Sequence, residues 1–132
     1  DNSPLYPFGY GLSYTTFEYS NLSLSSDRIK KDGTITVTVN VKNSGKYEGE
    51  EIVQLYIRDL VGSVTRPVKE LKDFKKILLK PHETKTVHFL ITPDKLMFYD
   101  INMNYTIEAG DFKVFVGKNS VDVLEASFSV ID

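Results

Sequence analysis

The sequence contains no cysteine and no tryptophan, and its charges nearly cancel. Without cysteine there is no disulfide framework, no thiolate metal site and no cysteine nucleophile. The 16 Lys and Arg residues against 18 Asp and Glu give a net charge of −2, whereas a nucleic-acid-binding domain is expected to be basic. No apolar run approaches the roughly 18 residues of a membrane-spanning helix. We therefore expect that this chain does not bind nucleic acid and that it has no membrane-spanning helix.

The remaining composition is that of a folded domain. The chain has 132 residues, of which 41% are hydrophobic and 12% aromatic. A chain of this length buries about two-thirds of the surface that it exposes when unfolded. This excludes intrinsic disorder as the main state and predicts one domain with a short appendage.

A repeat of two residues between apolar and polar side chains dominates from Thr15 onward. The clearest example is the stretch 34–42, where Ile and Val alternate with Thr, Asn and Lys. Similar alternation follows at 53–58, 86–92, 112–116 and 124–130, with turn residues between the stretches. Such alternation is typical of strands with one buried face. With about seven strands and no long helix, the pattern predicts an all-β, antiparallel sandwich of the immunoglobulin or fibronectin type III kind.

Three local irregularities refine this prediction. The apolar phase changes near Ser20 and Asn21, which indicates a bulge. The stretch 66–79 begins at a proline and does not hold the two-residue period, so we expect a long edge strand with a bulge near Lys72 and Asp73. Thr92 followed by a proline predicts the start of a helix of about one turn.

The first 14 residues differ from the rest. Two prolines exclude a regular helix or central strand there, and the aromatic residues are too many for a solvated linker. We expect residues 1–14 to be a junction segment and residues 15–132 to be the sandwich. Because the chain begins with Asp rather than Met, it is expected to be a processed or excised piece. The aromatic side chains either cover one end of this domain or dock onto another domain; the docking candidates are Tyr6, Phe8, Tyr10 and Tyr14.

Few residues suggest chemistry. Glu50 and Glu51 are adjacent on a predicted strand and point to opposite faces, so they cannot form the facing carboxylate pair of a retaining glycosidase. We expect Glu51 to extend to solvent or to pair with Lys or Arg. His82 and His88 have no metal-binding spacing, and we predict no catalytic residue, no metal site and no cofactor. Tyr47, in a predicted turn, is the best candidate for contacting a sugar.

Four segments together resemble a known family. They are LYPFGYGLSYTTF at 5–17, GEEIVQLY at 49–56, RPVKELKDF at 66–74 and AGDF at 109–112. They are similar to the C-terminal fibronectin type III-like domain of family 3 glycoside hydrolases, the β-glucosidases and β-xylosidases. The first segment is the most specific, and Asp73 stands where the family commonly has glycine. The resemblance covers nearly the whole chain.

The resemblance implies a non-catalytic accessory domain. In the family the catalytic carboxylates lie on preceding domains, so no catalytic residue is carried over to this sequence. The parent polypeptide would hydrolyse O-glycosidic bonds, in the first place those of β-glucosides, in the periplasm or outside the cell. The expected partners are the upstream catalytic domains of the same polypeptide. Two alternatives stay open: a carbohydrate-binding module with an oligosaccharide partner, and a spacer or protein-interaction module.

Overall fold

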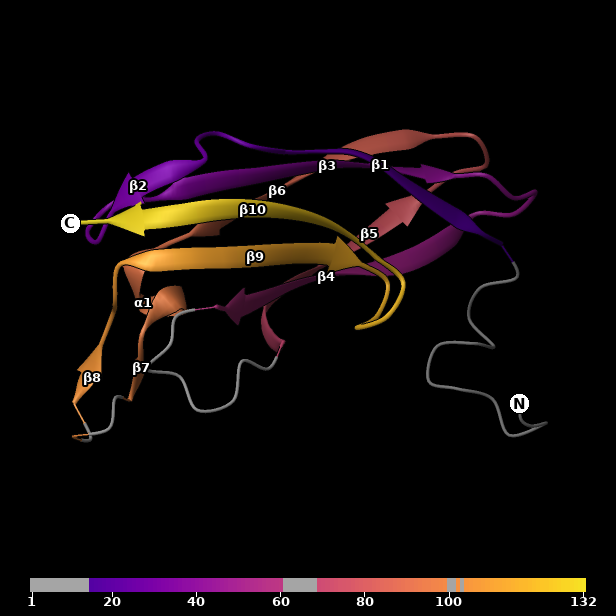
Figure 1. The fold of residues 1–132 in the computed structure, drawn as a ribbon. Coiled ribbons are helices and arrows are strands. Elements are labelled where there is room, and N and C mark those ends of the chain that lie inside the picture. Colours follow the sequence, from indigo (N-terminus) through magenta and orange to yellow (C-terminus); the bar gives the residue numbers. More distant parts are fainter. Residues whose placement is uncertain (1–14, 61–68, 100–101, 103) are drawn as a thin grey trace.

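The computed structural model describes residues 15–60, 69–99, 102 and 104–132, and in them two β-sheets lie face to face (Figure 1). The first sheet has the order β1-β3-β6, made of β1 (Phe17–Leu24), β3 (Ile35–Asn43) and β6 (Thr84–Ile91). The second has the order β2-β10-β9-β4-β5, made of β2 (Arg28–Lys30), β10 (Val123–Ile131), β9 (Gly110–Gly117), β4 (Gly49–Asp59) and β5 (Glu70–Leu79). A helix, α1 (Pro93–Leu96), and a small ribbon of β7 (Phe98–Tyr99) and β8 (Tyr105–Thr106) complete these elements.

The β-sandwich that the alternation predicts is confirmed. Among the described strands, those of eight or more residues are β1, β3, β4, β5, β6, β9 and β10, which matches the predicted number of about seven. The sequence did not predict β2, β7 and β8, which have only two or three residues each. The β2 strand also runs parallel to β10, an exception in an otherwise antiparallel fold.

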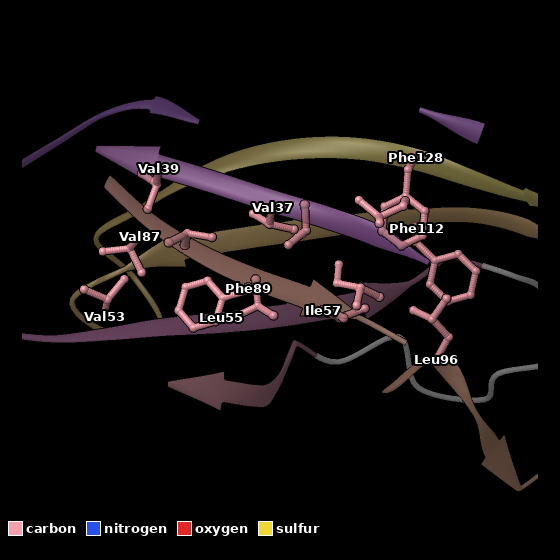
Figure 2. Packing of buried hydrophobic residues seen from close by; sticks show 14 of the residues in the cluster. Val37, Val39, Val53, Leu55, Ile57, Val87, Phe89, Leu96, Phe112 and Phe128 are labelled. Carbon is pink, nitrogen blue, oxygen red and sulfur yellow. The ribbon is translucent and has the colours of Figure 1, made fainter. Parts of the chain in front are cut away.

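The core lies between the two sheets and follows directly from the alternation. In β3 every second side chain, from Ile35 to Val41, is fully buried, and the side chains between them are partly exposed. Figure 2 shows the side chains of β3 and β6 facing those of β4, β9 and β10 across the sandwich. The rings of Phe112 and Phe128 stack at 5.3 Å between centroids near one end of this core. Burial of such side chains, worth about 1.5–3 kcal/mol each, is the main stabilising term of the fold.

Both predicted bulges are confirmed. The register of β1 against β3 shifts between Ser20 and Ser23, and Asn21 there has a φ of 56°. In β5, Asp73 pairs with Leu55 and Leu71 with Tyr56, which leaves Lys72 as the additional residue. β5 is an edge of its sheet, as predicted, although residues 66–68 of that stretch lie outside the described part.

The predicted single helical turn is also present, as α1. Thr92 is its N-cap residue and Pro93 its first residue, but the Thr92 hydroxyl donates to the Asp94 carboxylate instead of capping a backbone amide. Leu96 is buried and closes one end of the core (Figure 2). No helix within the described ranges is long and apolar enough to cross a membrane.

Candidate functional site

The predicted docking residues Tyr6, Phe8, Tyr10 and Tyr14 lie outside the described residues. The described chain begins at Thr15, and the contacts of this residue fix the position at which the backbone joins the sandwich. Thr15 lies against the turn between β3 and β4, which crosses from one sheet to the other.

Asn43 organises this turn with a fully buried side chain. Its Nδ2 donates to the carbonyl oxygens of Tyr47 at 2.8 Å and Leu79 at 3.0 Å. Its Oδ1 accepts from the Thr15 hydroxyl at 2.6 Å and from the Gly45 amide at 2.9 Å. All four bonding positions of the amide are therefore used, as a buried polar side chain requires.

Two further contacts fix the incoming strand to the turn. The Ser44 amide donates to the Thr16 carbonyl at 2.9 Å, and the hydroxyls of the two residues share a 2.7 Å hydrogen bond. At Gly45 an added Cβ would lie 1.8 Å from Thr15 Oγ1 and 2.9 Å from Thr15 Cβ, so only glycine fits. We call Thr15, Thr16, Asn43, Ser44 and Gly45 the junction turn. It sets the path of the chain at residue 15 relative to the sandwich.

Tyr47, the predicted sugar contact, follows the junction turn directly. Its side chain is 61% exposed, while its carbonyl is held by Asn43. Two other strongly exposed aromatic residues among those described, Phe74 and Tyr105, lie on β5 and β8. The exposed aromatic residues therefore come from three different elements.

Tyr19 and Glu51 connect the two sheets at the same end of the sandwich. The Tyr19 phenol, on β1, donates to Glu51 Oε2, on β4, at 2.8 Å. Burial raises the pKa of Glu51 above its usual range, although the hydrogen bond from Tyr19 and the charge of Lys118 oppose this shift. Burial and the neighbouring Glu51 carboxylate also raise the pKa of Tyr19, so the phenol keeps its proton and remains a donor.

This carboxylate has no catalytic partner on its own strand. Glu50 lies on the opposite face, as predicted, where it pairs with Lys76 at 3.5 Å. Glu51 is partly exposed and the charge of Lys118 acts on it, but its hydrogen-bond partner is a tyrosine on the facing sheet, which the sequence did not predict. A raised pKa alone does not make a general acid. The pair is a hydrogen bond between sheets.

Two hollows lie on the surface, one beside Tyr19 and the other at the opposite end of the sandwich. The first, about 240 Å³, is lined by Tyr19 and Lys118 together with parts of β1, β9 and β10. The second, about 320 Å³, is lined by Asp27 and Asp111, and the latter accepts a 2.7 Å hydrogen bond from the Ser129 hydroxyl. Ligand pockets typically enclose about 300–1,000 Å³. The first hollow is therefore below the lower limit of this range, and the second is only just above it.

The two histidines make hydrogen bonds to neighbouring strands and turns of the sandwich. His88 Nδ1 lies 3.1 Å from the Thr38 hydroxyl across β3 and β6. His82, with a φ of 67°, lies in the turn before β6, and its amide donates to the Asn43 carbonyl. Across the described ranges, no three His, Asp or Glu side chains are grouped so that they could hold a metal ion.

The outer faces of the two sheets differ in polarity. On the three-stranded sheet the outward side chains of β3 and β6 are mostly Thr, Asn and His, and they bond to one another: Thr38 with His88 and Asn40 with Thr86. On the five-stranded sheet, β5 presents Leu71, Phe74 and Leu78, which are 51%, 60% and 47% exposed. These three residues, which we call the β5 face, are opposite Tyr56, Gln54 and Glu50 in the register.

The comparisons with known proteins agree with this fold. Residues 51–120, more than half of the chain, match the model of the Fn3-like family, the fibronectin type III-like domain. The chain belongs to this family. The curated relatives that contain such a domain include the periplasmic β-glucosidase of Salmonella typhimurium, which is 50% identical over 98% of this chain. A putative β-xylosidase of Formosa agariphila is 48% identical over the same share.

Solved structures give the same picture of the fibronectin type III-like domain. The β-glucosidase of Listeria innocua, in complex with glucose, superposes with a TM-score of 0.86 and 40% identity over 99% of this chain. The chain spans 17% of the length of the two curated relatives and 18% of the Listeria enzyme. The resemblance to family 3 glycoside hydrolases is thereby confirmed, and this chain corresponds to about a sixth of such proteins.

Sequence reasoning missed two features of this surface. Asn43 begins an Asn-Ser-Gly sequence that is typical of a turn after a strand, and nothing local indicates that its side chain is buried. The β5 face was missed although a signal existed. Apolar residues at 71, 74 and 78 are out of phase with the inward-facing positions of that strand, and this departure was interpreted as irregularity alone.

Proposed function

We propose that this chain is a non-catalytic accessory domain of a β-glycosidase and that it stabilises the catalytic part of the same polypeptide by packing against it. One observation carries the proposal. The chain is 50% identical to a β-glucosidase and 48% identical to a putative β-xylosidase, and it spans only 17% of the length of each. In such proteins most of the polypeptide lies outside the fibronectin type III-like domain, and we place the catalytic groups in that larger part. β-Glucosides are the first substrate class that we propose for the parent.

The junction turn supports this role. A rigid connection favours stabilisation of the neighbouring domain, because a flexible linker leaves two domains freer to move independently. Here Thr15 and Thr16 are held by Asn43 and Ser44 through hydrogen bonds of 2.6–2.9 Å. We propose that Tyr6, Phe8, Tyr10 and Tyr14 continue this connection by docking on the preceding domain.

The test is removal of residues 15–132 from the full-length polypeptide. We expect a lower melting temperature and lower solubility, while the ratio of kcat/KM between β-glucosides and β-xylosides stays unchanged. The variant Asn43→Ala in the full-length polypeptide is a milder control, since it loosens the junction turn without removing the domain. An unchanged melting curve after truncation contradicts the proposal.

Direct binding of an oligosaccharide is a second candidate, favoured by one observation. Tyr47 exposes its ring on a turn whose backbone is held by Asn43, and such a ring can stack on a pyranose. The test is an amide NMR titration with cello-, xylo- and laminari-oligosaccharides at millimolar concentration. Shifts around Tyr47 that disappear in Tyr47→Ala support sugar binding, and flat spectra contradict it.

A further inference from the structure

We propose that the β5 face is the surface through which this domain docks on the catalytic part of its own polypeptide. This inference rests on the proposed function and names the surface that performs it. The starting observation is that part of β5 departs from the usual polarity of a half-buried strand, in which apolar side chains point inward and polar ones outward. Ile77 and Leu79 still pack inward, but large apolar side chains also lie on the outward face.

The outward positions of β5 carry Leu71, Phe74 and Leu78, each about half exposed or more. The inward phase instead includes two charged residues at the open edge of the sandwich. Asp73 pairs with Lys95 of α1 at 3.6 Å, and the Lys75 ammonium lies 5.5 Å from the centre of the Phe89 ring. In this part of β5 two charged residues thus occupy inward positions at the edge, and three large apolar side chains on the outward face stay exposed. Packing within this domain does not explain that arrangement.

The neighbouring Phe115 is an aromatic side chain on the outer face that other residues of this domain cover. It also lies on the outer face of the five-stranded sheet, opposite Tyr56, but it is only 4% exposed. The Lys69 ammonium lies 4.1 Å from the centre of its ring and donates to the Ser120 carbonyl at 2.8 Å. Phe74, on the same face, is 60% exposed. Three large apolar side chains exposed along one strand, beside an aromatic ring that the domain covers itself, are the observation from which we infer an interaction surface.

The chemistry of the surroundings favours an apolar protein surface as the partner. Two lysines on this face lie beside carboxylates: Lys76 is 3.5 Å from Glu50, and Lys113 is 3.1 Å from Glu125. These carboxylates reduce the attraction of the face for a polyanion. A sugar is also a poor fit, because two of the three exposed side chains are leucines, and sugar sites need placed polar groups beside the stacking ring.

Pairing of β5 with a second copy of this chain is disfavoured by the strand itself. The bulge at Lys72 and the lysines at 72, 75 and 76 are devices that keep an edge strand from pairing with another. The catalytic part of the polypeptide is the favoured occupant because the relatives are about six times as long as this chain. A tethered partner is present at a millimolar effective concentration, so a modest patch is sufficient to bind it.

The experiment measures thiol reactivity in the full-length polypeptide. Single variants Leu78→Cys and Phe74→Cys report on the β5 face, and Leu90→Cys is the matched control on the other sheet. Leu78 and Leu90 are both 47% exposed within this domain, and the domain has no cysteine of its own. Labelled peptides are identified by mass spectrometry, and each rate is divided by its rate in denaturant.

We expect the thiols at 74 and 78 to react at least about tenfold more slowly than the thiol at 90, at every protein concentration. The reason is that the catalytic part must separate from the β5 face before these thiols can react. Equal rates at 78 and 90 overturn the inference. Protection that disappears on dilution overturns it too, since the occupant is then a second copy. If truncation destabilises the polypeptide but the rates are equal, the proposed function stands and the docking surface lies elsewhere. If both tests fail, both proposals fall.

Discussion

Asn43 Oδ1 accepts a 2.6 Å hydrogen bond from the hydroxyl of Thr15, a residue 28 positions earlier in the chain. The backbone of Asn43 reaches a third segment, because its carbonyl accepts from the His82 amide at 2.8 Å and its amide donates to the Glu83 carbonyl at 2.9 Å. One buried side chain and its backbone thus hold together the incoming chain, the β3–β4 turn and the β5–β6 turn.

We therefore expect Asn43→Ala to lower the free energy of unfolding by about 2–3 kcal/mol, because it leaves the Tyr47 and Leu79 carbonyls and the Gly45 amide without this partner. Urea unfolding of the 132-residue chain measures this. The matched control is Asn40→Ala, which loses only an exposed bond to Thr86 and should cost less than about 0.5 kcal/mol. Equal losses in the two variants contradict the assigned role.

The close approach at Gly45 gives a second prediction. Gly45→Ala should displace Thr15, since the new Cβ would lie 1.8 Å from Thr15 Oγ1, at a cost of about 1–3 kcal/mol. Hydrogen exchange at the Ser44 amide, which donates to Thr16, should become faster. Gly33→Ala is the control, because its Cβ would approach other atoms no closer than 3.2 Å. Unchanged exchange at Ser44 would show that the junction turn tolerates the methyl group.

A third prediction concerns the pH dependence of stability. Burial raises the pKa of Glu51 in the folded state, so the folded state binds this proton more tightly than the unfolded state. The stabilising contribution is complete below the unfolded pKa of about 4.3 and is lost as the pH rises through the raised folded pKa. Glu51→Gln keeps an acceptor for Tyr19 and removes the charge. We expect it to raise the melting temperature at pH 7–8 and to flatten the pH dependence above about 4.3.

Two variants check this assignment. Tyr19→Phe removes the hydrogen bond that opposes the shift, so it should raise the pKa of Glu51 further and cost about 1 kcal/mol at neutral pH. Glu50→Gln is the matched control, because it removes the charge of an exposed carboxylate on the opposite face of the same strand. A profile that is altered as much by Glu50→Gln as by Glu51→Gln contradicts the role of burial.

A fourth prediction separates exposed from buried aromatic residues. In the 132-residue chain, Phe74→Ser should change the free energy of unfolding by less than about 0.5 kcal/mol, because the side chain is already largely in water. Phe112→Ala should cost about 3–5 kcal/mol, since it removes a buried ring stacked on Phe128. Denaturant titration measures both. A large loss for Phe74→Ser would mean that this ring stabilises the domain itself.

The sequence predicted the fold well and the site poorly, for a physical reason. Alternation such as that of 34–42 records which face of a strand is buried, and the phase changes near Asn21 and Lys72 marked real bulges. Strands as short as β2 carry too few residues for a period to be recognised. Two of the four hydrogen-bond partners of the Asn43 side chain lie 28 and 36 residues away, so its burial depends on tertiary packing that no local pattern records.

The direction of β10 has a consequence for experiments on the whole polypeptide. β10 starts beside the end of β9, at the end of the sandwich where the junction turn lies, and it ends at Ile131 beside Lys30 (Figure 1). Nine strand residues at about 3.3 Å each span about 30 Å. A fluorophore attached beyond Ile131 would therefore be held roughly one sandwich length from Thr15. Energy transfer from a donor on the preceding part of the polypeptide would then report tilting of the domain as a change in distance.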